Sequence, residues 1–204
     1  GMEKILEYLV EKYQPESMIV YGSFADGSYN ENSDFDVLVI ASGEKRHDAS
    51  VVDGTVLDAF VYPPETFAGA FDPADFVQIF DGKIVLDNKG VAAKLRARVL
   101  AYLDALPMKA MDEVRQDVAW CRKMQSRTLR GDAEGFYRWH WLLTESLLIY
   151  CDARRWHCFG PKKALRQMQR EQPGHYAAYR TALEEFTQSA LSGWLDCLEE
   201  SMDS

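Results

Sequence analysis

Two aspartates separated by one residue stand where a hydrophobic run begins in the first quarter of the chain. Asp34 and Asp36 flank the start of a β-strand predicted over residues 35–40. Alternate residues of a strand point to the same face, so both carboxylates project together while Phe35 points into the core. Two carboxylates this close repel each other unless a cation lies between them. Their oxygens suit Mg²⁺, which usually keeps water and substrate phosphates among its ligands.

A third carboxylate, Asp58, lies in the middle of the strand predicted over residues 55–62. An aspartate without a partner in a central strand would be costly. The partner is a metal ion in one interpretation and a nearby basic side chain in the other. Asp53 is the rival for this role, but it precedes Gly54 and is therefore assigned to a turn.

A Gly-Ser pair ends the strand predicted over residues 17–21. At Gly22 and Ser23 a strand gives way to a predicted helix, so free backbone N–H groups and a hydroxyl point at one spot. Glycine is the residue that lets the backbone approach a ligand closely. The pair therefore predicts a site for the phosphates of a bound nucleotide.

The elements that must position these residues form an α+β chain. An amphipathic helix ends before Pro15, and the three strands above are followed by a hairpin predicted over 76–80 and 83–86 around Asp81–Gly82. After residue 90 the pattern becomes helical, with breaks at proline and glycine. We therefore predict a small mixed-sheet domain over residues 1–90, followed by an all-helical bundle domain over residues 91–204. The helices are expected at 91–105, 110–130, 133–153, 162–170 and 176–200.

The composition narrows the class of protein. A net charge of −9 argues against a broad nucleic-acid surface, which would normally be basic. The chain has no apolar run of the length that a bilayer needs. We therefore expect a soluble, cytoplasmic protein that binds neither nucleic acid nor membrane.

Gly-Ser, about ten residues, Asp-x-Asp in a hydrophobic strand and a third Asp on a neighbouring strand together resemble the signature of the DNA polymerase β-like nucleotidyltransferase superfamily. The resemblance covers roughly residues 15–90 and is similar to the minimal and the aminoglycoside-type members, in which a helical domain follows the catalytic one. It implies that Gly22 and Ser23 hold the triphosphate and that Asp34, Asp36 and Asp58 ligate two Mg²⁺ ions. Minimal members often carry a basic residue where this chain has Asp26, which weakens the expected triphosphate contact.

The same resemblance implies an activity. We expect transfer of a nucleoside monophosphate from ATP or another nucleoside triphosphate to a hydroxyl of an unknown small molecule, with loss of pyrophosphate. Two other interpretations stay open. The acceptor can be a protein side chain, as in antitoxin-like minimal members, or the chain can be a nucleotide-binding regulatory module without turnover. The intact set of carboxylates argues against the last of these.

Three residues of the helical half are further candidates. Glu145 lies in an apolar helix, where a carboxylate tends to gain the raised pKa of a general base, the role that a helical-domain glutamate has in aminoglycoside-modifying relatives. An ion pair with Arg138 is its structural alternative. Lys162 and Lys163 follow Gly160–Pro161 at a predicted helix start, where the dipole disfavours cations. They are candidates for contacts with the triphosphate or, equally, solvated surface lysines.

Overall fold

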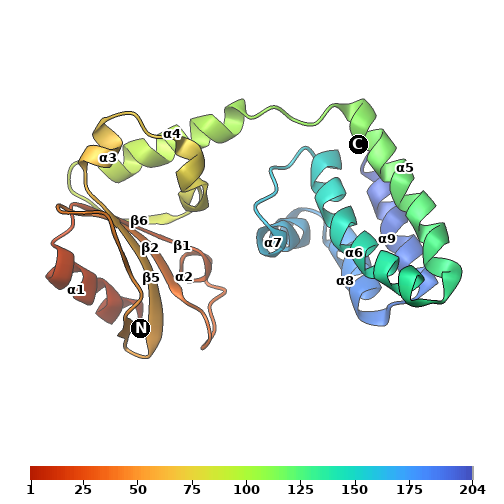
Figure 1. Cartoon of the computed structure of the whole chain (residues 1–204), viewed down its shortest axis with the longest axis horizontal. Coiled ribbons are helices and arrows are strands. Elements are labelled where there is room, and N and C mark those ends of the chain that lie inside the picture. Colours follow the sequence, from red (N-terminus) through yellow and green to blue (C-terminus); the bar gives the residue numbers. More distant parts are fainter. Residues whose placement is uncertain (204) are drawn as a thin grey trace. The chain divides into compact units, whose positions relative to one another are not determined.

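The computed structural model describes residues 1–203 and contains two compact units, one over Gly1–Leu106 and one from Pro107 onward. The first unit holds a mixed β-sheet with helices on its faces, and the second consists of helices (Figure 1). The predicted α+β fold class, a small mixed-sheet domain followed by a helical bundle, is therefore confirmed.

The sheet of the first unit has the strand order β3-β5-β2-β1-β6, and the short strand β4 pairs with β5. Strands β2 and β5 are parallel, while the other pairs are antiparallel. Every side chain of β1 is buried, as expected for a central strand with both faces covered. The strands run over Ser17–Tyr21 (β1), Phe35–Ile40 (β2), Arg46–Asp48 (β3), Val51–Val52 (β4), Thr55–Tyr62 (β5) and Lys83–Asp87 (β6).

Helices cover both faces of this sheet. Helix α1 (Met2–Tyr13) packs its buried Ile5 and Leu9 on one face, against the inward side chains of β2 and β5. Helix α4 (Val91–Ala105) lies on the opposite side of the strands (Figure 1). It packs there with β1, β6 and the 3₁₀ segment η1 (Pro73–Ile79). Two short helices, α2 (Ser23–Asp26) and α3 (Glu65–Ala68), occupy loops at the ends of strands.

The hairpin predicted around Asp81–Gly82 is wrong. The segment before it is the 3₁₀ helix η1, which begins at Pro73 and is capped by the Asp72 side chain accepting from the Ala74 N–H. Gly82 has a different role, because a Cβ there would stand 2.7 Å from Ile19 Cγ2 and 2.9 Å from the Val20 carbonyl oxygen. The chain does turn at Phe80 and Asp81, where the Gly82 N–H donates to the Ile79 carbonyl oxygen at 3.0 Å, but this turn joins η1 to β6, and the glycine allows the chain to pass close to β1.

Helix α4 belongs to the first unit, whereas the sequence pattern changes at residue 90. The carboxylate of Asp87, at the end of β6, accepts hydrogen bonds from the N–H groups of Ala92 and Ala93. Further along α4, Arg96 donates to the Gly82 carbonyl oxygen at 2.9 Å. These bonds tie the helix to the sheet, so a change from strand to helix does not coincide with the end of the compact unit.

The second unit has a core built on α6 (Ala133–Ala153), with Trp194 and Tyr150 fully buried. Trp194 Nε1 donates to Ser146 Oγ at 2.9 Å, which satisfies the indole inside the core. The helix expected over 176–200 is two helices, because Phe186 adopts a φ of 53° and the Thr187 side chain caps a new start. The other elements are α5 (Met111–Arg127), η2 (Thr128–Arg130), α7 (Pro161–Glu171), α8 (Pro173–Glu185) and α9 (Gln188–Glu200).

Within residues 1–203, no helix combines the length and the apolar character that crossing a bilayer requires.

Candidate active site

The turn at Gly22 brings the backbone against a carboxylate. Gly22 follows β1 with a φ of 70° and a ψ of −150°, a combination that is essentially restricted to glycine. A Cβ at this position would stand 2.3 Å from Asp36 Oδ2 and 3.2 Å from Asp36 Cγ. Ser23, the next residue, is buried and begins α2. The glycine therefore meets two requirements, its backbone conformation and the space that the Asp36 carboxylate occupies.

Asp36 and Asp58 lie side by side. They are register partners in the parallel pair β2 and β5, so their side chains leave the same face of the sheet. On the other side of β2, Tyr21 of β1 is the partner of Asp36. Burial raises the pKa of the Tyr21 hydroxyl, and the charges of Asp36 and Asp58 raise it further. Asp36 and Asp58 thus concentrate negative charge on this face of the sheet.

Asp34 lies just outside β2, two residues before Asp36, and is exposed. The turn that precedes it is closed by its own polar groups: Asn30 N–H donates to Ser33 Oγ at 2.8 Å, and Ser33 N–H donates to the Asn30 carbonyl oxygen at 3.1 Å. Aromatic packing holds the same loop, because Phe24 contacts the buried Phe35 with ring centroids 5.1 Å apart. Asp34 therefore stands at the end of a turn that hydrogen bonds close, and Asp36 follows it in β2, next to the packed Phe35.

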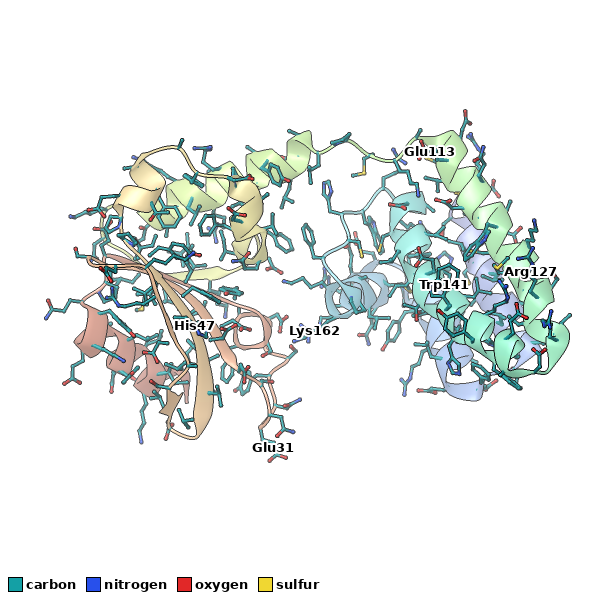
Figure 2. The ribbon with its side chains drawn as sticks, viewed as in Figure 1. Glu31, His47, Glu113, Arg127, Trp141 and Lys162 are labelled. Carbon is teal, nitrogen blue, oxygen red and sulfur yellow. The ribbon has the colours of Figure 1, made fainter. Side chains whose placement is uncertain are left out.

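Asp58 has a basic partner that the sequence analysis did not identify. His47 on the edge strand β3 lies with Nε2 at 2.6 Å from Asp58 Oδ1, and Figure 2 labels this histidine. Its ring also contacts Phe60, at 4.5 Å between ring centroids. Both partners are accessible, with 44% of the His47 side chain and 38% of the Asp58 side chain exposed. The hydrogen bond uses one carboxylate oxygen of Asp58, so a basic partner and a cation are compatible at this residue.

Asp53, the rival of Asp58, lies in the turn between β4 and β5, as its place before Gly54 suggested. Its carboxylate pairs with the amino group of Gly1 at 2.5 Å. Among residues 1–203, no group of three or more His, Cys, Asp or Glu side chains is gathered closely enough to hold a metal ion. The described conformation thus brings together Asp36 and Asp58, with Asp34 at the adjoining loop end.

Glu145 lines a pocket inside the second unit. It lies on α6, is partly exposed, and shares a pocket of about 240 Å³ with Trp120, Trp141 and Asp152. Arg138 pairs with Glu134 at 2.8 Å instead of with Glu145, and Glu145 makes no ion pair within residues 1–203. Because Arg138 pairs with Glu134, the ion-pair alternative between Glu145 and Arg138 is wrong. In the same pocket, burial raises the pKa of the Asp152 carboxyl.

Lys162 and Lys163 occupy the first turn of α7, directly after Pro161 (Figure 2 labels Lys162). Lys162 is exposed and Lys163 is partly buried. The N-cap of this helix is Gly160, which has no side chain of its own to cap the helix end. The two lysines share a helix end, as the sequence predicted.

Part of the chain matches a known protein family. Residues 2–94 match the family described as nucleotidyltransferase domain. No curated protein matches the chain. The match covers Gly22, Asp36 and Asp58, and it ends within α4.

Three solved structures resemble the chain weakly. One is a toxin–antitoxin structure with AMP-PNP, at 14% identity over 51% of this chain and 87% of that one, with a TM-score of 0.37. A nucleotidyltransferase-like protein from Exiguobacterium sibiricum 255-15 has 16% identity over 100% of this chain and 75% of its own, with a TM-score of 0.36. Spectinomycin adenyltransferase AAD(9) from Enterococcus faecialis, with ATP and spectinomycin, has 10% identity over 100% and 98%, with a TM-score of 0.39. At these TM-scores the likeness of the whole chains is too weak to indicate a function, whereas the family match covers residues 2–94.

Proposed function

We propose that the chain transfers the AMP group of ATP to a hydroxyl of a small molecule and releases pyrophosphate, because residues 2–94 match the nucleotidyltransferase domain family. The reaction depends on Mg²⁺ in this proposal, and it takes place in the cytoplasm. The observation that carries it is the register pairing of Asp36 with Asp58, beside a Gly22 backbone that leaves room for the Asp36 carboxylate.

The carboxylates fit a hard divalent cation. Asp34, Asp36 and Asp58 offer oxygen donors alone, which is the chemistry that Mg²⁺ prefers. Two of the three already lie side by side, and their mutual repulsion favours a cation between them. When bound, two Mg²⁺ ions would neutralise the triphosphate and the charge that develops on the attacking and leaving oxygens.

The chain's own groups handle the phosphates and the proton. The acceptor's hydroxyl oxygen forms a bond with the α-phosphorus, and the bond from that phosphorus to the bridging oxygen of the β-phosphate breaks. Gly22 and Ser23 hold the triphosphate for this displacement, with Lys162 and Lys163 as further contacts. Asp58 helps to activate the hydroxyl, and His47 positions the Asp58 carboxylate through the bond to Oδ1. Pyrophosphate leaves with the electrons of the broken bond.

Glu145 is the proposed general base, which receives the proton of the acceptor hydroxyl. Two features of its pocket support this role. Its carboxylate has no ion-pair partner within residues 1–203, so it is available to accept a proton. Trp120 and Trp141 wall the pocket at 5.4 Å between ring centroids, in an edge-to-face arrangement that suits the body of a small molecule. These aromatic walls support a small-molecule acceptor in this proposal.

ATP labelled at the α-phosphate tests the proposal. The protein is incubated with this ATP and Mg²⁺, once with hydroxyl-bearing small molecules, including aminoglycosides and lincosamides, and once with cell lysate. Label on a small molecule supports the proposal, and label on a protein supports the alternative acceptor class. Failure of the wild-type protein to transfer label to either would favour a silent nucleotide-binding module.

Two variants show whether the carboxylates are responsible. Asp36→Asn removes one charge of the register pair and is expected to abolish transfer. Asp53→Asn removes the same charge from the β4–β5 turn. This variant loses the contact with Gly1 but should keep full activity. Equal activity in the two variants would contradict the assigned site.

A further inference from the structure

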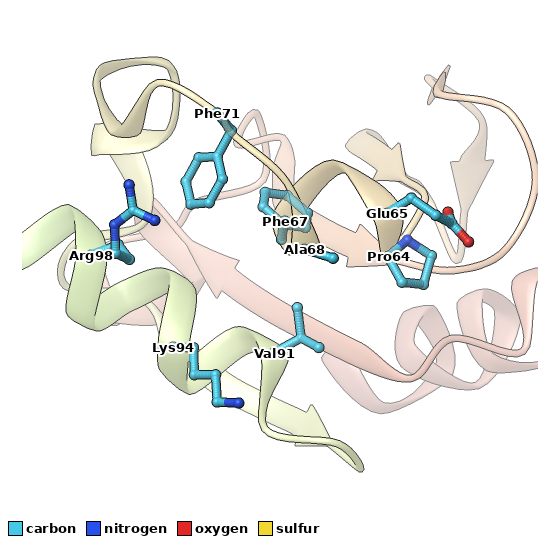
Figure 3. Close-up of a pocket in the computed structure, with 8 residues that line it drawn as sticks. All are labelled: Pro64, Glu65, Phe67, Ala68, Phe71, Val91, Lys94 and Arg98. Atoms are coloured by element: carbon cyan, nitrogen blue, oxygen red, sulfur yellow. The ribbon is translucent and has the colours of Figure 1, made fainter.

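A pocket of about 610 Å³ lies in the first unit between α3 and α4 (Figure 3). Its volume is within the range of sites that hold small molecules. The pocket begins at Pro64, two residues after the end of β5 at Tyr62, whereas Asp58 lies four residues before that end. At the rise of a β-strand this separation is about 13 Å along β5. The pocket is therefore distinct from the paired carboxylates.

Aromatic rings form one wall of this pocket. Phe67 and Phe71 are partly buried and contact each other edge to face, with ring centroids 5.4 Å apart. Both also contact the buried Phe76, at 5.1 and 5.9 Å. These contacts hold the rings in place, so the apolar wall exists before any ligand binds. Helix α3, which carries Phe67, has four residues and buries none of them, which leaves the Phe67 ring open to the pocket.

Two cations stand on the opposite wall. Lys94 and Arg98 are four residues apart on α4, so they share one face of the helix, and both are exposed. Neither forms an ion pair within residues 1–203. The Arg98 guanidinium lies over the Phe71 ring, 4.7 Å from its centroid, which directs it to the aromatic wall. The acidic Glu65 lines the other end of the pocket (Figure 3).

The aromatic wall together with Lys94 and Arg98 should favour a ligand with negative charge. In a chain with a net charge of −9, two cations that form no ion pair among the described residues 1–203 meet an apolar wall. An arginine binds a carboxylate through two parallel N–H donors, and a lysine adds a point charge. We propose that this pocket binds a small aromatic carboxylate, with its ring against Phe67 and Phe71 and its carboxylate on Lys94 and Arg98. The aromatic wall accounts for the ring and the cations account for the charge.

The experiment measures binding of 1-naphthoate to the full chain by saturation-transfer difference NMR, with 1-naphthamide as a neutral probe of the same shape. Naphthoate should bind at least tenfold more tightly than naphthamide, because the amide cannot pair with the cations. The double variant Lys94→Gln/Arg98→Gln should lose the same factor for naphthoate and little for naphthamide. Lys83→Gln is the control and should leave both affinities unchanged, because Lys83 is an exposed lysine on β6 that forms no ion pair within the described part of the chain.

Saturating ATP with Mg²⁺ separates this pocket from the nucleotide site, and the naphthoate affinity should be the same with and without it. Three results would each overturn the proposal: equal affinity for naphthoate and naphthamide, unchanged naphthoate binding in the double variant, or competitive displacement by ATP. The two substituted side chains are exposed, so the double variant is expected to fold, and its melting temperature checks this.

Discussion

Gly22 and Asp36 are in such close contact that a methyl group on the glycine would overlap the carboxylate. The position of a Cβ at residue 22 is 2.3 Å from Asp36 Oδ2. The two residues come from different parts of the proposed site, since Gly22 belongs to the turn after β1 that is proposed to hold the triphosphate and Asp36 lies on β2. This contact links the two halves of the site.

Gly22→Ala should therefore lower both stability and activity. The backbone conformation of Gly22 alone costs on the order of 1–3 kcal/mol for a residue with a Cβ, and the overlap with Asp36 adds to it. Gly27→Ala is the matched control, because Gly27 also has a positive φ but a Cβ there meets no atom within 4 Å. Thermal unfolding of both variants and of Gly22→Ala in an Asp36→Ala background measures the overlap. An equal loss in the two backgrounds would contradict it.

The hydrogen bond between His47 and Asp58 predicts a positioning role. His47→Ala should reduce the transfer rate by roughly tenfold, because Asp58 loses the group that holds one of its oxygens. His47→Gln keeps an N–H donor and should recover most of that loss. The melting temperature should change little, since the His47 side chain is 44% exposed. Full activity of His47→Ala would exclude the role.

Glu145→Gln tests the general base. The variant should bind ATP with unchanged affinity and lose transfer by on the order of a hundredfold, as expected when a base is removed. Glu134→Gln, on the same helix, is the control and should keep its activity, because Glu134 is paired with Arg130 and Arg138. If Glu145→Gln transfers at the wild-type rate, Asp58 is the remaining candidate for the base.

Asp48 predicts how stability depends on pH. Burial would raise the pKa of its carboxyl, but hydrogen bonds from Ser50, Tyr13 and Lys12 outweigh this and hold the pKa well below its usual range. The stabilisation is therefore complete above the unfolded pKa, near 4, and is lost as pH falls towards the folded pKa. Asp48→Asn should lower the melting temperature at pH 7 by on the order of 5 °C. Between pH 5 and pH 3 the variant should lose less stability than the wild type, and parallel losses would refute the assignment.

The sequence was informative where pattern and chemistry agreed. The hydrophobic run after Asp34 predicted β2, and helices α4 and α6 have the predicted bounds, with Gly90 and Asp132 as their N-cap residues. His47 was missed since β3 has three residues, Arg46–His47–Asp48, with no apolar alternation. Its pairing with β5 is a tertiary effect that a short polar stretch does not reveal.

Two local signals were misread for physical reasons. Asp81–Gly82 is typical of a hairpin, but the glycine meets a close approach to Ile19 and the preceding residues form η1. The break between α8 and α9 has no glycine or proline. It occurs at Phe186, and the capping Thr187 was the available signal. The roles of Glu145 and the two lysines of α7 remain predictions, since each depends on a bound substrate.

Calorimetry of ATP binding tests the central claim, that the paired carboxylates hold the nucleotide through a divalent cation. The wild type should bind ATP in Mg²⁺ and lose that affinity by at least tenfold in EDTA, because without a cation Asp36 and Asp58 repel the triphosphate. In Asp36→Asn the difference between Mg²⁺ and EDTA should shrink. Equal ATP affinity of the wild type with and without metal would contradict the account.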